Sequence, residues 1–298
     1  MNAPGNCVFV CGVTGNQGGT LARKLVQLGW TVHATARDLE APRALALATL
    51  GALRASLVSC DKIFINLVST VEDFDRERRQ AAAISMIAKD VGVRQAIVST
   101  SLVVSLYNGG GHLGGVLEPG SILHALVKVK HDVEETVRSM EFESCTFLRP
   151  GYFMANFLEP VIESYSEILS KNTQSTVFKA ETQLGLTDHE DIASIAVEAF
   201  RDSNRFNGRA IGLVSEFLTP QETMDYLGSA MGRSGLKAIF LNDSEVSALP
   251  AGSFDNPYVK GDKCLEYMAQ VIVVQPGNSY DSSVEGNKVP ASFVLCRV

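Results

Sequence analysis

The chain has 298 residues, of which 46% are hydrophobic, and its 26 basic and 33 acidic residues give a net charge of −7. A chain of this size can bury a full core and could form one large domain or two unequal ones. Its longest basic block, residues 76–79, is short. We therefore expect no nucleic acid as main partner, because neutralising phosphates needs clustered Lys and Arg.

The N-terminus is polar and leads directly into an apolar run, which predicts no signal peptide. No apolar run approaches the ~20 residues that cross a bilayer, so we expect a cytoplasmic protein without membrane contact. Six cysteines lie at positions 7, 11, 60, 145, 264 and 296 without a C-x-x-C pair, which is typical of buried, reduced thiols. The five histidines show no ligand spacing with the cysteines, so we expect no metal site.

A strand, a glycine-rich turn and a helix follow one another at the start of the chain. Residues 7–11 suit a buried strand, the glycines recur as Gly12-x-x-Gly15-x-x-Gly18, and a helical pattern opens at Thr20. In dinucleotide-binding folds the first glycine permits the tight turn, the second lets the backbone approach a diphosphate, and the third allows close helix–strand packing. The pattern predicts a diphosphate site, and the alternative is an ordinary strand–turn–helix corner.

A second predicted strand, residues 30–36, ends at Arg37. An acidic residue at this place accepts hydrogen bonds from the ribose 2′-OH of NAD, whereas an arginine neutralises the 2′-phosphate of NADP. Arg37 therefore favours NADP(H), the alternative being a solvated surface charge.

The following segments alternate regularly. We predict helices over residues 39–59, 74–91 and 124–140, and strands over residues 60–70, 93–101 and 145–149. The small polar residues that end the first two of these strands, Asn66 and Ser69 among them, would lie at the carboxyl edge of a parallel sheet, where cofactors bind. The glycine-rich loop at residues 108–115 is either a mobile lid or a surface insertion.

After Gly151 the alternation of strands and helices becomes less regular. We predict a short strand at 183–187, a helix at 191–202, a strand at 208–214 and a helix at 220–231, for which Thr219 is the N-cap. The alternation predicts an α/β fold with a doubly wound parallel sheet. We assign residues 1–150 to an NADP(H)-binding Rossmann domain and residues 151–298 to a smaller substrate lobe, some segments of which return to the sheet. The last forty residues show no clear pattern.

Three stretches together resemble the NmrA-like family, an atypical branch of the short-chain dehydrogenase/reductase superfamily. They are the glycine turn at 12–18, Lys-His-Asp-Val-Glu-Glu at 130–135, and Leu-Arg-Pro-Gly-Tyr-Phe-Met-Ala-Asn-Phe at 148–157. The resemblance implies an NADP(H)-binding Rossmann domain with a small C-terminal substrate lobe, and leaves the activity open, because the family holds reductases, enzymes of secondary metabolism and redox sensors. The candidate cofactor-binding residues are Gly12, Thr14, Gly15, Asn16, Gln17, Gly18, Arg37, Asn66, Val68, Ser69, Lys130, Tyr152, Phe153 and Asn156.

The chain departs from the superfamily pattern at two places. Four residues before Lys130, where short-chain dehydrogenases carry a proton-transferring tyrosine, stands Leu126. His124 and Tyr107 are the nearest substitutes, and neither is in register. Residues 50–55 also lack the pattern of the third strand and acidic turn that relatives have at this place. Either the sheet lacks a strand there, or the segment that forms it is missing from this sequence.

Lys130 is the first catalytic candidate. Its ammonium could hold the nicotinamide ribose, polarise a carbonyl or supply a proton. The alternative is a helix-surface lysine paired with Glu134. Ser99, Ser101 and Tyr107 are the other catalytic candidates. Tyr152, Phe153, Met154 and Asn156 would wall the nicotinamide side, or form core between the two lobes.

We therefore expect an NADP(H)-dependent enzyme that acts on a small, largely apolar metabolite of secondary metabolism, by hydride transfer to C=O, C=N or C=C or by cofactor-assisted cyclisation. The alternative is an NADP(H)-sensing regulator without turnover. Substrate identity and oligomeric state do not follow from the sequence.

Overall fold

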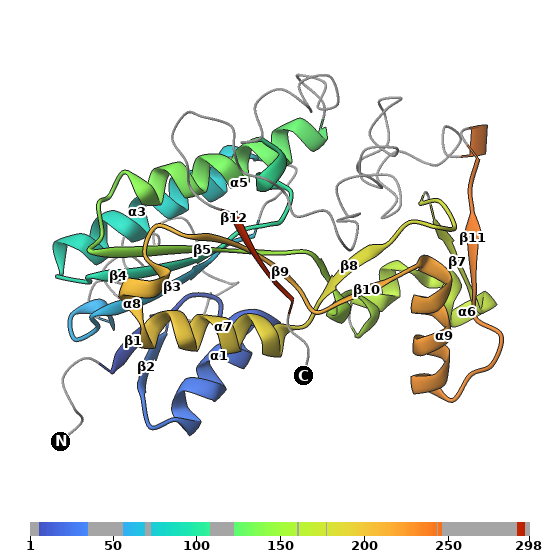
Figure 1. Ribbon diagram of the computed structural model, residues 1–298, viewed down its shortest axis with the longest axis horizontal. Coiled ribbons are helices and arrows are strands. Elements are labelled where there is room, and N and C mark those ends of the chain that lie inside the picture. The colour runs from blue at the N-terminus through green and yellow to red at the C-terminus, as the bar shows by residue number, and fades with distance from the viewer. Residues whose placement is uncertain are drawn as a thin grey trace, which may run out of the picture.

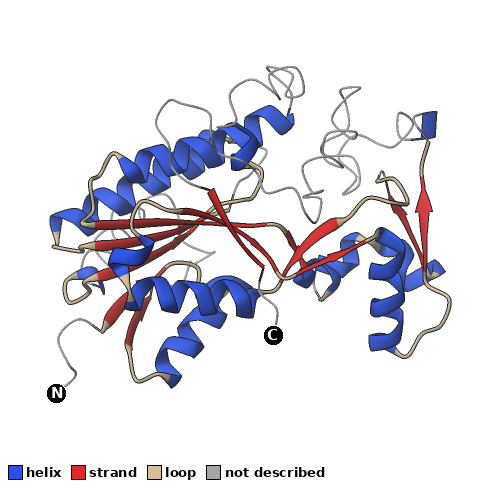
Figure 2. Cartoon of the chain, in the orientation of Figure 1, coloured by secondary structure: helices blue, strands red, loops and turns tan. Residues whose placement is uncertain are grey.

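A seven-stranded parallel sheet forms the centre of the protein (Figures 1 and 2). The computed structural model describes residues 6–34, 56–68, 73–107, 122–159, 161–176, 178–242, 244–245 and 291–295. The strand order is β12-β9-β5-β4-β3-β1-β2, and every neighbouring pair is parallel. The strands are β1 (Cys7–Val10), β2 (Thr31–Ala34), β3 (Lys62–Asn66), β4 (Gln95–Ser99), β5 (Ser144–Pro150), β9 (Ala210–Val214) and β12 (Ala291–Leu295).

Helices cover both faces of this sheet (Figure 1). On one face α1 (Asn16–Gln27) packs against α7 (His189–Arg201), and on the other α3 (Asp75–Asp90) packs against α5 (Ile122–Arg138). Alternate strand residues point to opposite faces, so Val8 and Val10 enter the core beneath α1 and α7, whereas Phe9 enters the core beneath α3 and α5. The predicted doubly wound α/β sheet is confirmed.

The order of the strands reverses between β1 and β3. The chain runs from β1 outward to β2 and then returns across β1 to form β3 on its other side. In open α/β sheets the crevice outside the carboxyl ends of two such strands is the usual place for a ligand. Among the described residues β2 is the last strand in the order. The expected helix at 39–59 and the departure at 50–55 lie almost wholly outside the described residues.

A smaller lobe follows β5 directly (Figure 1). It contains a three-stranded sheet of β10 (Glu216–Leu218), β8 (Leu184–Thr187) and β6 (Tyr152–Phe153), and a parallel pair of β7 (Thr173–Thr176) and β11 (Lys237–Phe240). Its helices are η1 (Met154–Phe157), η2 (Val161–Ser164), α6 (Ser166–Lys171) and α9 (Pro220–Met231). A Cβ at Gly151 would lie 2.3 Å from the Gly185 carbonyl oxygen, so glycine is required where the chain passes from the sheet into this lobe.

Most predicted elements agree with the observed ones to within a few residues. Thr219 caps α9 as predicted, and it forms a complete capping box with Glu222. β9 and β12 return to the large sheet, and β12 lies within the last forty residues, where no element was predicted. The short elements β6, η1, η2, α6, β7, β10 and β11 of the small lobe were not predicted, nor were two short helices outside it, α4 (Val104–Tyr107) and α8 (Ser203–Phe206). No helix in the described part of the chain is long and apolar enough to span a bilayer.

Candidate cofactor site

The glycine turn joins β1 to α1 at the carboxyl end of the sheet. Gly12 has a φ of +69°, and the Gly15 N–H donates to the Gly12 carbonyl oxygen at 2.9 Å, which closes the turn. A Cβ at Gly18 would lie 2.5 Å from that same oxygen, so only glycine lets α1 approach β1 this closely. A Cβ at Gly15 would meet the Gly12 carbonyl oxygen at 3.4 Å, an ordinary contact. Folding therefore requires a glycine at position 18, whereas a Cβ at position 15 would make only an ordinary contact with the backbone.

The N-terminus of α1 suits an anion. Its N-cap residue is Gly15, which offers no side-chain cap, and its first turn holds no acidic residue. The first N–H groups of a helix lack intrahelical partners and carry partial positive charge. Thr14, Gly15 and Asn16 are exposed, so a diphosphate could reach these groups. The turn thus fits the diphosphate of a dinucleotide on its own geometry.

Two further candidates lie beside this turn, and a third follows the same strand as one of them. A Cβ at Gly12 would lie 3.7 Å from Asn66 Nδ2, at the end of β3. Ser99 Oγ, at the end of β4, donates to Gln17 Oε1 at 2.7 Å. Val68 follows β3 and its residue is 64% exposed. Ser69, Arg37 and the loop at 108–115 lie outside the described residues.

Lys130 lies beside the same edge of the sheet. Its Nζ is 2.6 Å from Glu77 Oε1 and donates to the Leu67 carbonyl oxygen, just beyond β3, at 3.2 Å. Glu77 is 1% exposed, so this ion pair joins α5 to α3 beneath the surface. The alternative prediction, a surface lysine paired with Glu134, is wrong, because Glu134 faces β5 and pairs with a different residue.

That residue is Arg149, and the pair is the main polar feature that the sequence did not reveal. Arg149 Nε and Nη2 donate to the two Glu134 carboxylate oxygens at 2.9 and 2.6 Å, and Thr100 Oγ1 donates to Glu134 Oε1 at 2.7 Å. Arg149 Nη1 also reaches Ser105 Oγ at 3.2 Å. All of these side chains except Ser105 are buried. The network holds the segment after β4 that carries the half-buried Ser101 and leads to Tyr107.

The aromatic candidates have packing partners of their own. Tyr152 OH hydrogen-bonds Tyr165 OH, and the Tyr152 and Phe157 ring centroids lie 6.0 Å apart in the small lobe. Phe153 stacks on His189 with centroids 5.3 Å apart, and burial lowers the pKa of that histidine. Asn156 and Met154 are half-buried in η1. These contacts favour the interpretation of Phe153 as core between the lobes, whereas Tyr152 packs in the core of the small lobe.

Two other features can be set apart from the cofactor site. Burial raises the pKa of the Cys11 thiol to about 12, so this residue beside the glycine turn is a neutral packing group. A surface hollow of about 390 Å³ is lined by residues between 224 and 236, around the end of α9. The described candidate residues lie between positions 12 and 156, so the hollow contains none of them.

The chain matches the model of the NmrA-like family over residues 5–247. The uncharacterised oxidoreductase YesF of Bacillus subtilis is 28% identical to it over 273 residues, with 89% of this chain and 86% of the relative covered. The NmrA-like family domain-containing oxidoreductase hkm9 of Aspergillus hancockii is 24% identical over 261 residues, with 78% and 75% covered.

Solved structures of similar fold include one protein that is described as a regulator and another that is described as a reductase. NmrA, described as a negative transcriptional regulator and solved in complex with NADP, superposes with a TM-score of 0.61 at 20% identity, covering 80% of this chain and 75% of that one. The triphenylmethane reductase of Citrobacter sp., complexed with NADP(H), gives 0.59 at 15% identity, covering 89% of each chain.

Proposed function

The chain belongs to the NmrA-like family, and we propose that it is an NADP(H)-dependent oxidoreductase acting on a small, largely apolar metabolite. The observation that carries the proposal is the turn at residues 12–18. It lies where the strand order reverses, exposes Gly15 to solvent and begins an α-helix that has no acidic residue in its first turn. Two relatives are named oxidoreductases, and the similar structures of NmrA and triphenylmethane reductase hold NADP or NADP(H).

The chain's own residues would divide the binding of the cofactor among them. The backbone and side chains of Gly12, Thr14, Gly15, Asn16, Gln17 and Gly18 would hold the diphosphate, and Arg37 the 2′-phosphate. Asn66, Val68 and Ser69 would line the carboxyl end of β3. When bound, NADPH supplies the two electrons and one hydrogen that reduce a C=O, C=N or C=C bond.

Lys130 acts in this proposal as a positioning residue. Glu77 neutralises its charge, and the Leu67 carbonyl oxygen directs its ammonium to the end of β3. The position four residues before it, where the superfamily has a tyrosine, holds Leu126. Ser99 Oγ already donates its hydrogen to Gln17. Ser101 and Tyr107 are therefore the candidate donors of the proton that completes the reduction.

A second function, an NADP(H) sensor without turnover, draws on the same contacts. The ammonium of Lys130 is held in an ion pair with buried Glu77, and the tyrosine of the superfamily is replaced by Leu126. Such a site would bind the cofactor yet lack a proton relay. The structurally similar NmrA is described as a regulator.

Two measurements test the proposal. Calorimetric titration should show NADP(H) binding at least about tenfold tighter than NAD(H), with the difference reduced in Arg37→Ala, since a charge-assisted bond contributes about 1.5–3 kcal/mol. Equal affinities in the unchanged protein would exclude Arg37 as a 2′-phosphate ligand.

Single-turnover kinetics at saturating NADPH, with a panel of ketones, imines and enones, separates enzyme from sensor. In the enzyme, Lys130→Met should lower the rate by roughly 10²–10⁴-fold, the size of a proton-transfer or positioning contribution. Lys128→Met is the matched control, because Lys128 lies on the same helix and pairs with Asp132 at the surface. Tight NADPH binding with no turnover of any panel member would favour the sensor.

A further inference from the structure

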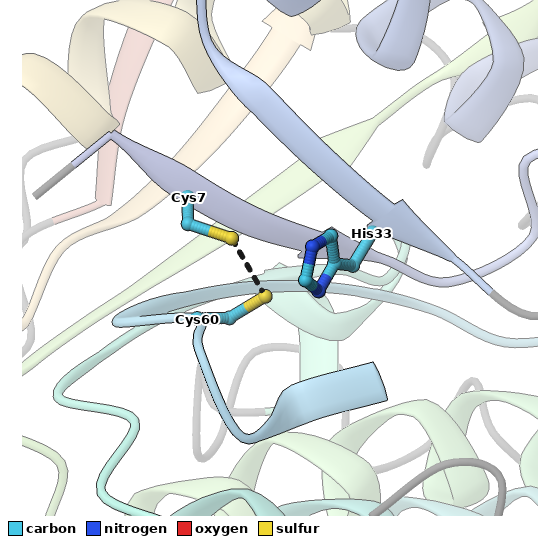
Figure 3. A group of neighbouring side chains, drawn as sticks. All are labelled: Cys7, His33 and Cys60. Carbon is cyan, nitrogen blue, oxygen red and sulfur yellow. Dashed lines mark hydrogen bonds between the residues drawn. The ribbon is translucent and has the colours of Figure 1, made fainter. Parts of the chain in front are cut away.

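Three side chains with metal-binding chemistry meet near the edge of the large sheet, and the proposed cofactor site uses none of them. Cys7 begins β1, His33 lies in β2, and Cys60 lies two residues before β3. One ligand atom from each lies within 4.8 Å of the other two. The two sulfur atoms are 3.1 Å apart, and the His33 imidazole stands beside them (Figure 3).

The strand register brings these residues together. β1 and β2 pair so that Cys7 lies beside Thr31 and Phe9 lies beside His33. Alternate residues of a strand project to one face, so Cys7 and His33 share the face of Phe9, which α3 and α5 cover. Cys60 reaches the same place from the chain entering β3, where the Asp61 N–H donates to the Cys7 carbonyl oxygen at 3.3 Å.

His33 makes the kind of second hydrogen bond that metal-ligating histidines make. Its Nδ1 lies 2.7 Å from the Ser56 carbonyl oxygen. Because a carbonyl can only accept, a neutral imidazole carries its proton on Nδ1, and Nε2 keeps the lone pair that binds a metal. Metal-bound histidines commonly donate their second N–H to such an oxygen. Cys60 Sγ is 3.6 Å from the same oxygen, so the Ser56 carbonyl orients two of the three side chains.

Asp61, next to Cys60, pairs with Lys62 through Oδ2 at 2.7 Å and lies 3.9 Å from Arg94, so two cationic side chains already compensate its charge. Its buried Oδ1 has no hydrogen-bond partner among the described residues. Cys7 and His33 are only partly buried, whereas Cys60 is buried.

We propose that Cys7, His33 and Cys60 form a binding site for one thiophilic metal ion of the zinc class. Two thiolates and a neutral imidazole are the donor set that such ions prefer, and zinc would complete its four-coordination with a further ligand such as water. Binding releases the two thiol protons to solvent and joins β1, β2 and the entry to β3. The metal has a structural role, because it links β2, the last strand in the described sheet order, to the neighbouring strands.

Reduced, chelator-treated full-length protein tests this directly with Co²⁺ as a spectroscopic probe and Zn²⁺ in calorimetry. We expect one ion per chain, a thiolate-to-Co²⁺ charge-transfer band that Zn²⁺ abolishes, and release of two protons at a pH where both thiols are protonated. We also expect Zn²⁺ to raise the midpoint of thermal unfolding, because an ion that binds the folded state preferentially stabilises it.

Cys7→Ser and Cys60→Ser should each remove the charge-transfer band or halve its intensity, and His33→Gln should weaken Zn²⁺ binding at least roughly tenfold. Cys145→Ala is the matched control, because Cys145 is also a buried thiol on the large sheet but lies in β5, outside the cluster. Circular dichroism identifies any variant that fails to fold. We expect His33→Gln to disturb folding least of the three, because His33 is only partly buried. If the reduced protein binds Zn²⁺ no tighter than Cys7→Ser does, or if its Co²⁺ complex shows no thiolate band, the proposal is overturned.

Discussion

Replacing Glu134 with leucine should destabilise the protein more than any surface change, because it leaves a buried arginine without its carboxylate. Glu134 is 1% exposed and Arg149 is 3% exposed. Two of the donors of Arg149 are directed at Glu134, and the third reaches only the Ser105 hydroxyl. Removing one partner of such a pair costs about 3–5 kcal/mol, most of it the penalty of an uncompensated buried charge.

The reverse change should cost less. Arg149→Met leaves the Glu134 carboxylate with the Thr100 hydroxyl at 2.7 Å and with Arg138 at 4.0 Å. We expect a loss near the lower end, about 3 kcal/mol. The double variant Glu134→Leu/Arg149→Met buries no unpaired charge and loses mainly the two hydroxyl contacts, each worth about 1 kcal/mol. It should therefore be more stable than Glu134→Leu.

Urea unfolding followed by circular dichroism measures the three free energies in one thermodynamic cycle. Arg201→Met is the control, because Arg201 pairs with Glu198 at 2.9 Å with both side chains about half exposed, and such a pair contributes about 0–1 kcal/mol. A Glu134→Leu protein as stable as this control, or a double variant that loses the sum of the single losses, would refute the reasoning.

Three further predictions follow from single positions. Gly18→Ala should unfold at clearly lower urea concentration, whereas Gly15→Ala should keep its fold but lose at least about tenfold in NADPH affinity by calorimetry; normal NADPH binding by Gly15→Ala would place the diphosphate elsewhere. Thr219→Ala should cost about 0.5–2 kcal/mol in urea unfolding through loss of the capping box, and an unchanged midpoint would contradict that role. Burial lowers the pKa of His189 below 6.5, so the unfolded state binds its proton first as the pH falls through that value, and stability decreases there. His189→Gln should reduce the loss of stability that occurs as the pH falls below about 6.5, and an equal pH dependence in both proteins would show that His189 does not contribute.

Local chemistry was enough to predict the first unit of the fold. The turn at residues 12–18 depends on glycine conformations and on the apolar runs beside it, all within a few residues, so its geometry could be inferred before the structure. The capping box at Thr219 is equally local. The alternation of strands and helices then predicts a parallel sheet, because parallel strands need long crossovers.

Contacts between residues far apart in the chain depend on which surfaces of the helices and strands face each other, so only the tertiary structure revealed them. Lys130 and Glu77 are 53 residues apart and meet because α5 packs on α3, whereas the sequence offered the nearer Glu134. β12 has no periodicity of its own to mark it and is recognisable only by its pairing with β9. Cys7, His33 and Cys60 have no common spacing, and they come together through the register of β1 with β2 and the path of the chain that enters β3. The sequence shows which residues carry charge, can adopt a turn or can bind a ligand. The packing of elements far apart in the chain determines which of these residues come into contact.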